Sequence, residues 1–488
     1  MAHEPVSAAW GGLHDHAANM YDHASMASNV RPLWGSRVQA PLVPAGVELS
    51  SSTRIDVPLA PHDVAATRVH VDELLRLGLI DGDGRERLVA ALARIGAELE
   101  AGTFAWSEDH EDVHMNVEAA VREQVGRELA GQLQAGRSRN EEVVTDERRW
   151  LLTAIGRLLA GVRTLQRTLA ERADEHPDAV LPAHTHTQPA QPMLLAHHLL
   201  AYVEMLDRDH DRLADAAARA DACPAGSGAA VGSGLALDRD AIAARLGFAR
   251  TTANSLDAIA DRDYALEVVA AVAICLNHLS RLAADLVLWS TPYLGFVRIG
   301  DGYATGSSML PNKRNPDVAE LIRSRAARAN GQLSAMVGVL AGLPLGYHRD
   351  LQETRAPMLD AVASLALCLE AGAGLVAGVT FETDRMRAAA TAGHALATAL
   401  AERLLAAGVP FRDAHWRVGE LVARAEELGC DLSEMPIGEL RTALPELADH
   451  DPIIPTLSDA LAAANLPGGT APARVRAAVT AALEHLNA

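Results

Sequence analysis

Lysine is almost absent from this sequence. Lys and Arg together number 43, and only Lys313 is lysine; it lies in the stretch GSSMLPNKRNP, residues 306–316. A general preference for arginine explains the other cations but not this exception. Lysine is a compact point charge with three donors, whereas arginine presents a planar fork. We infer that position 313 requires an ammonium group, as it would if it approached a single carboxylate oxygen of an anionic substrate.

Cysteine is also scarce. The four cysteines, Cys223, Cys275, Cys368 and Cys430, lie far apart and form no CxxC pair. This spacing argues against a structural zinc site and against a disulfide framework. Free thiols in a reducing cytoplasm are therefore expected.

Aromatic residues make up only 3% of the chain, and acidic residues outnumber basic ones, giving a formal net charge of −20. Such a charge disfavours nucleic acid and anionic membrane surfaces as partners. Any anionic ligand would need a local cluster of cations. Residues 1–30 lack the apolar segment of a signal peptide, and the most apolar run, 265–279, is interrupted by Glu267 and Asn277. We expect a soluble cytoplasmic protein.

Helical periodicity dominates the remainder of the chain. A chain of 488 residues is long enough for two to four domains. Residues 31–60 are rich in Pro, Val and Ser and predict an extended arm, after which apolar spacing predicts helices near 63–76 and 84–100. Three long amphipathic segments follow at 145–173, 192–220 and 262–289, and Asn315-Pro316 predicts another helix start with Asn315 as N-cap. We predict an all-α protein with three helical domains, at 1–118, 119–370 and 371–488, the central one a bundle of very long helices.

Irregular segments at 135–142, 181–192, 255–264 and 306–316 separate the long helices, and each mixes small polar residues with a cation or imidazole. Each also has an ordinary interpretation. Ser138 or Asn140 could be a helix N-cap, and His184 with His186 could bind a metal, although no third ligand is suitably spaced. A helix bundle brings such segments to the same level, where together they could hold carboxylates.

A superfamily signature and seven further motifs then point to a known family. GSSMLPNKRNP resembles the signature of the aspartase/fumarase superfamily. The other motifs resemble those of the argininosuccinate lyase branch, which includes the delta-crystallins, and they occur in the same order along nearly the whole chain from Trp34: LWGSR, EDVH, AGRSRN, THTQPAQP, NSLDAIADRDY, GLPLGYHRDLQE and GGTAPARVR.

The resemblance implies homotetramers with a central twenty-helix core and active sites built from three subunits. It implies β-elimination that releases fumarate from an N-substituted L-aspartate, argininosuccinate first of all, without a cofactor or metal. Ser307 would be the base that removes the Cβ proton, while Lys313 and Asn315 would hold the carboxylate that gains charge. His186, supported by Glu320, would transfer a proton to the leaving nitrogen.

The resemblance also implies two sets of substrate-binding residues. The set expected around the succinyl half is Ser138, Arg139, Asn140 and Thr185. The set expected around the leaving amino-acid half is Arg262, Tyr347, Gln352, Arg355, Ser52 and Asp56.

Several positions depart from the family pattern. Leu310 stands in place of Met, Asn312 in place of Gln, and Thr354-Arg355 in place of Asp-Lys. These changes flank the residues expected to abstract the proton, so the elimination is expected to be kept while the leaving amine is open. One alternative is the same reaction on an ethylenediamine-disuccinate-type or hydrazine-type conjugate. Another is a catalytically silent crystallin-like protein, which the retained candidate residues disfavour.

Overall fold

The structure is a computed structural model, and it describes residues 42–487. The chain divides into a unit spanning Met1–Ser51 and a unit spanning Ser52–Ala488. The described part of the first unit contains helix α2, Pro44–Ser50. Residues 1–30 and the first part of the expected arm lie outside the described residues.

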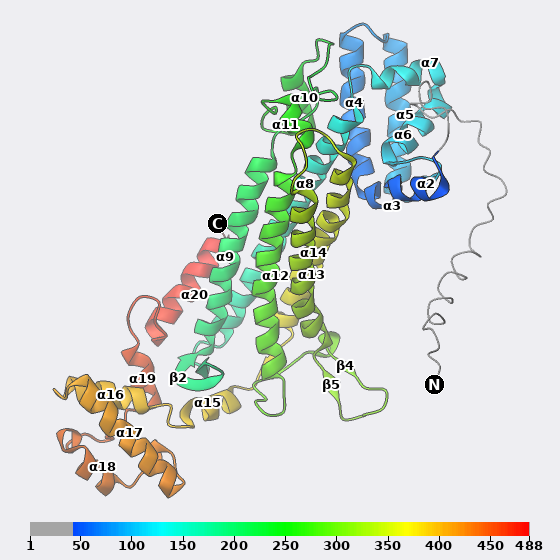
Figure 1. Cartoon of the computed structure of the whole chain (residues 1–488). Coiled ribbons are helices and arrows are strands. Elements are labelled where there is room, and N and C mark those ends of the chain that lie inside the picture. The colour runs from blue at the N-terminus through cyan, green and yellow to red at the C-terminus, as the bar shows by residue number, and fades with distance from the viewer. Residues whose placement is uncertain (1–41, 488) are drawn as a thin grey trace, which may run out of the picture. The chain divides into compact units, whose positions relative to one another are not determined.

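Helices make up most of the second unit, which confirms the all-α prediction (Figure 1). Its α-helices are α3 (Thr53–Asp56), α4 (Ala60–Arg76), α5 (Gly82–Glu100), α6 (Val113–Val125), α7 (Arg127–Ala130), α8 (Arg139–Glu175), α9 (Leu195–Ala220), α10 (Arg239–Leu246), α11 (Ser255–Ala260), α12 (Asp263–Trp289), α13 (Asp317–Leu340), α14 (Arg355–Ala377), α15 (Thr383–Thr391), α16 (Ala397–Ala406), α17 (Phe411–Leu428), α18 (Ile437–Ala443), α19 (Leu457–Ala463) and α20 (Pro472–Asn487). Its 3₁₀ turns are η2 (Val57–Leu59), η3 (Gly131–Gln134), η4 (Asp301–Tyr303), η5 (Arg349–Thr354), η6 (Leu432–Glu434) and η7 (Pro445–Leu447). Its short strands pair antiparallel as β1 (Val180–Thr185) with β2 (Gln188–Leu194), β3 (Val297–Arg298) with β6 (Thr380–Phe381), and β4 (Thr305–Gly306) with β5 (Arg314–Asn315).

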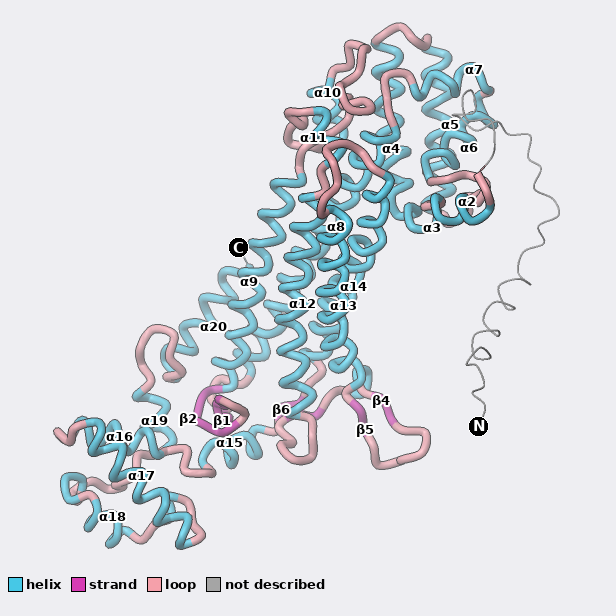
Figure 2. The backbone as a smooth tube through the Cα atoms, in the orientation of Figure 1, coloured by secondary structure: helices cyan, strands magenta, loops and turns pink. Residues whose placement is uncertain are grey.

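The long helices α8, α9, α12, α13 and α14 pack against one another as a bundle (Figure 2). The apolar stripe predicted on the second long helix is its buried face, which consists of Leu195, Leu199, Tyr202, Leu206 and Leu213. Because an amphipathic helix gains most of its stability by burying such a stripe, the sequence pattern is sufficient to specify this packing.

Successive bundle helices run in opposite directions, so the loops gather at two ends (Figures 1 and 2). One end carries the start of α8, the segment 221–262 and the segment 341–354, and we name it the Arg262 end. The other carries the β1–β2 hairpin and the segment 290–316, and we name it the Ser307 end. Helix α12 joins them with 27 residues, which at 1.5 Å per residue is about 40 Å.

Local predictions had mixed outcomes. Ser138 is the N-cap of α8 and forms a capping box with Glu141, as the first of its two interpretations predicted. The prediction that Asn315 caps the next helix was wrong: Asn315 lies in β5, and Pro316 occupies the N-cap of α13 without a side-chain cap. The expected extended arm was also wrong over 44–59, which is largely helical.

Two helical segments, Asp263–Trp289 and Arg349–Ala377, are long and apolar enough to cross a membrane by length and composition. The run at 265–279 lies within the first of these helices. Half or more of each apolar window is buried inside the protein, which is typical of core helices in a bundle. Separate hydrophobic clusters lie among the helices preceding the bundle and among α16, α17 and α18 that follow it.

Candidate active site

The loop between β4 and β5 carries Ser307 and Lys313 at the Ser307 end. The Ser307 Oγ accepts hydrogen bonds from the backbone N–H groups of Met309, at 3.3 Å, and Leu310, at 3.0 Å. Ser307 is half-buried and Lys313 is exposed. Two N–H donors on one hydroxyl oxygen favour its deprotonated form, which is what a serine base requires.

His186 lies in an unusual backbone conformation. β1 ends at Thr185 and β2 begins at Gln188, so His186 and Thr187 form the turn between them. Their φ angles are 54° and 60°, in the left-handed region that favours glycine. Such a turn usually takes Asn-Gly, and the β-branched Thr187 makes it costly. Strain of this kind concentrates at functional sites, and the turn presents an exposed imidazole at the Ser307 end. Glu320 is exposed on the first turn of α13, and within the described part of the chain it forms no hydrogen bond or ion pair with His186.

The start of α8 carries Ser138, Arg139 and Asn140 at the Arg262 end. The Asn140 side chain donates to the carbonyl oxygen of Ala229 at 3.0 Å, which ties the Gly-rich segment to the helix start. Arg139 lies among carboxylates, with its guanidinium 3.6 Å from Asp112 and 3.7 Å from Glu142. These three residues are half-buried in the single chain.

The residues expected around the leaving amino-acid half come together at the same end in one largely buried group of side chains, which we name the Arg262 chamber. Arg355 forms an ion pair with Asp56, and Ser52 donates its hydroxyl to Asp56 at 2.5 Å. Tyr347 lies close enough to act electrostatically on both Arg262 and Arg355. Gln352 lies in η5, shortly before Arg355 at the start of α14, and is also buried. Burial raises the pKa of Asp56, although Arg355 opposes the shift.

Glu147 joins this chamber, and sequence reasoning missed it. Its carboxylate lies 3.2 Å from the Nε of Arg262 and 3.3 Å from the Nε of Arg355, and it accepts a hydrogen bond from the Tyr264 hydroxyl. Glu147 is 1% exposed. The only available signal was its position two turns into α8, and a glutamate there usually faces solvent.

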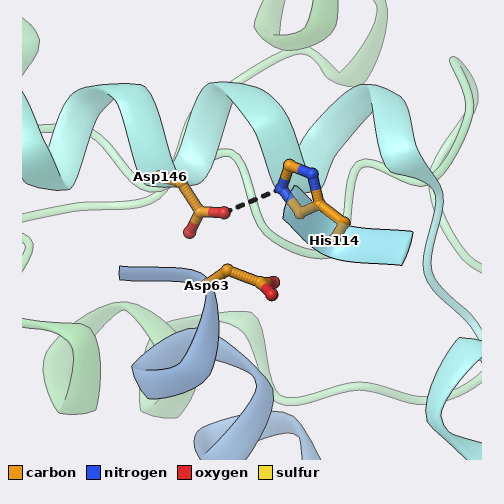
Figure 3. A group of neighbouring side chains, drawn as sticks. All are labelled: Asp63, His114 and Asp146. Atoms are coloured by element: carbon orange, nitrogen blue, oxygen red, sulfur yellow. Dashed lines mark hydrogen bonds and ion pairs between the residues drawn. The ribbon is translucent and has the colours of Figure 1, made fainter. Parts of the chain in front are cut away.

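A second buried cluster lies nearby, where α4, α6 and α8 meet. Asp63, His114 and Asp146 each offer one atom within 4.8 Å of the others, and the His114 Nε2 is 3.0 Å from Asp146 (Figure 3). Burial lowers the pKa of His114, but Asp63, Asp112 and Asp146 outweigh it and raise this pKa well above its usual value. The imidazolium and the neighbouring Arg137 already balance these carboxylates, so we interpret the cluster as an ion-pair network.

Comparisons with known proteins give the family. Residues 49–331 match a family model described as "Lyase", and residues 394–464 match one described as "Argininosuccinate lyase C-terminal". The chain is 44% identical to argininosuccinate lyase of Hyphomonas neptunium, over 91% of this chain and 95% of that protein. It is 43% identical to argininosuccinate lyase of Thiobacillus denitrificans, over 92% of this chain and 97% of that protein. The chain belongs to the argininosuccinate lyase family.

Solved structures agree with this assignment. EDDS lyase in complex with formate matches with a TM-score of 0.80 and 27% identity, covering 91% of this chain and 89% of that one. A class II fumarase from Schistosoma mansoni matches with a TM-score of 0.72 at 18% identity, which shows the shared fold. The family resemblance and the all-helical fold class are thereby confirmed.

The argininosuccinate lyase fold separates the candidate residues. Ser307, Lys313, Asn315, Glu320, Thr185 and His186 lie at the Ser307 end, whereas Ser138, Arg139, Asn140, Arg262, Tyr347, Gln352, Arg355, Ser52 and Asp56 lie at the Arg262 end. A single chain therefore brings together the residues expected around the leaving amino-acid half. The same chain holds Ser307, the expected base, far from them.

Proposed function

We propose that the protein is a C–N lyase that cleaves argininosuccinate to fumarate and arginine by β-elimination. The observation that carries the proposal is the Ser307 loop, in which two backbone N–H groups point at the hydroxyl oxygen of the proposed base in the same loop as the chain's single lysine. Sequence identity of 43–44% to argininosuccinate lyases over more than nine-tenths of the chain supports the substrate.

In the proposed reaction, the Ser307 alkoxide removes a proton from Cβ of the succinyl half. The electron pair moves into the adjacent carboxylate, which becomes a dianion held by Lys313 and Asn315. The dianion then collapses: its electron pair forms the carbon–carbon double bond of fumarate, the C–N bond breaks with its electrons leaving on nitrogen, and His186 delivers a proton to that nitrogen. Preplaced donors of this kind stabilise developing charge because they need not reorganise during the reaction.

We propose a homotetramer with sites shared between subunits. A substrate of this size cannot span the bundle, so Ser307 and the Arg262 chamber must come from different chains to act on one molecule. Apolar side chains exposed along α12, α13 and α14 support such an assembly: Ile274 (38%), Leu288 (50%), Leu321 (62%), Val337 (52%) and Leu367 (56%). Apolar side chains left exposed along the helices of a bundle are a common feature of surfaces that pack against another subunit. The expected cytoplasmic location and the three-domain division belong to the same proposal.

A second candidate substrate comes from the likeness to a protein named EDDS lyase. The altered pair Thr354-Arg355 lies in the chamber expected to hold the leaving amine. We therefore keep an ethylenediamine-disuccinate-type substrate as the alternative.

Steady-state kinetics tests the choice. We expect kcat/KM for argininosuccinate to exceed that for ethylenediamine disuccinate. If ethylenediamine disuccinate is preferred, the proposed leaving amine is wrong, but the proposed elimination reaction is retained. If neither substrate yields fumarate, the proposed function fails.

A further inference from the structure

The buried chamber at the Arg262 end contains two guanidinium groups that face one carboxylate. Arg262 comes from the start of α12, Arg355 from the start of α14, and Glu147 from α8. All three side chains are at most 3% exposed. Two cations this close repel each other in a region of low dielectric constant, and the carboxylate between them offsets that repulsion.

The two carboxylate oxygens of Glu147 contact different arginines. Oε2 lies 3.2 Å from Arg262 and accepts the Tyr264 hydroxyl, while Oε1 lies 3.3 Å from Arg355. Arg355 in turn contacts Asp56 through NH1. Glu147 thus fixes both guanidiniums relative to α8, whose first turn carries the residues proposed to bind the succinyl half.

The chamber also retains unused hydrogen-bonding capacity. Within the described part of the chain, Asp56 Oδ1 and Gln352 Oε1 are buried without a hydrogen-bond partner. The Nε groups of Arg262 and Arg355 face Glu147, at 3.2 Å and 3.3 Å. Two acceptors are therefore available to a ligand that offers donors, as the ammonium group of an α-amino acid does, while the two guanidiniums supply the positive charge that its carboxylate requires.

We propose that Glu147 is a positioning residue for the leaving-amine half: it holds Arg262 and Arg355 side by side so that this chamber accepts an amine bearing a carboxylate. The inference rests on the proposed function. Glu147 acts through the two arginines and has no role in proton transfer. Its loss should therefore weaken binding of the amine half and spare the fumarate half.

Glu147→Gln tests the proposal, because it removes the charge and keeps the shape. We expect KM for argininosuccinate to rise about tenfold with kcat within a few-fold of wild type, the size typical of a lost pocket contact. We expect product inhibition by L-arginine to weaken by a similar factor, while inhibition by fumarate is unchanged. Glu147→Asp retains the charge and should recover part of the arginine inhibition; it also serves as the test if Glu147→Gln does not fold.

Asp209→Asn is the matched control. Asp209 is another fully buried bundle carboxylate, paired with His278 at 2.6 Å and Arg212 at 3.0 Å, outside the chamber. It should lower stability without changing the ratio of the two inhibition constants. Equal weakening of arginine and fumarate by Glu147→Gln, or no change in either, would overturn the inference. A wild type that releases no fumarate from argininosuccinate would instead refute the proposed function, and the inference with it.

Discussion

Mixing two inactive variants tests the shared site most directly. Asn140→Ala alters the start of α8 at the Arg262 end, and Ser307→Ala alters the β4–β5 loop at the Ser307 end. Neither residue belongs to the hydrophobic core, since both are half-buried and polar. Each variant alone should fold, assemble and have little activity.

The expected recovery follows from the geometry. Helix α12 separates the two ends by 27 residues, which is about 40 Å and far longer than the substrate. A working site must therefore take Asn140 from one chain and Ser307 from another. In a random 1:1 mixture each position is intact half of the time, so about a quarter of the sites are native in a symmetric oligomer with shared sites.

The assay is fumarate release from argininosuccinate after subunit exchange, which is verified by native mass spectrometry. A negative control uses Ser307→Ala mixed with Lys313→Arg. Those two residues share one loop, so no mixed oligomer contains an intact copy of the loop. Recovery near a quarter in the first mixture and none in the second is expected. A fully active monomer, or no recovery after verified exchange, would refute the reasoning.

Three further predictions concern single residues. Ser307→Ala should lower kcat by at least about 10²–10³-fold with the secondary structure unchanged by circular dichroism; retention of a tenth of wild-type turnover would contradict the base assignment. Lys313→Arg should lose activity to a similar extent despite keeping the charge, because a planar fork cannot replace a point charge, and an active variant would reduce the lone lysine to a compositional accident. His114→Gln should destabilise the protein by about 3–5 kcal/mol near pH 6, since it breaks a buried ion-pair cluster. The pKa of His114 in the folded state lies above its unfolded value. The stability that the imidazolium contributes is therefore complete below pH 6.5 and is lost as pH rises through the folded pKa. Urea unfolding should show a smaller difference in the free energy of unfolding between wild type and variant at pH 9 than at pH 6, and an equal difference at both pH values would contradict the assignment.

The sequence predicted the bundle well because long periodic segments are specified by their own apolar stripes. The predictions from the sequence were wrong at two places, where the local composition was compatible with more than one backbone structure. Asn315-Pro316 has the composition of a helix start, yet pairing of Asn315 with Thr305 in the β4–β5 ladder displaces the cap by one residue. The Pro- and Val-rich segment 44–59 forms short helical turns because proline is accepted at the first turn of a helix.

The candidate site also contains residues that the sequence predicted and one that it did not. The alternation of long helices was enough to predict that the loops gather at common levels, and the amine-side residues do meet within one chain. Glu147 could not be predicted, because its role depends on two arginines more than a hundred residues away along the chain. No local pattern distinguishes it from a solvated helical glutamate.

Glu147 also accounts for the one cation that differs from the family pattern within this chamber. Arg355 departs from the motif pattern described in the sequence analysis, which has lysine there, and its guanidinium contacts Asp56 through NH1 and Glu147 through Nε. An ammonium is a point charge and lacks the fork that reaches both carboxylates in this way. Arginine at 355 and glutamate at 147 thus form one unit, in which a single guanidinium contacts two carboxylates. Lysine and arginine carry the same charge, so the change at 355 leaves the charge at that position unaltered and is compatible with the family's substrate. The same chemistry explains the contrast with Lys313: arginine is used where one cation must meet two carboxylates, and lysine is kept where one oxygen must be approached closely.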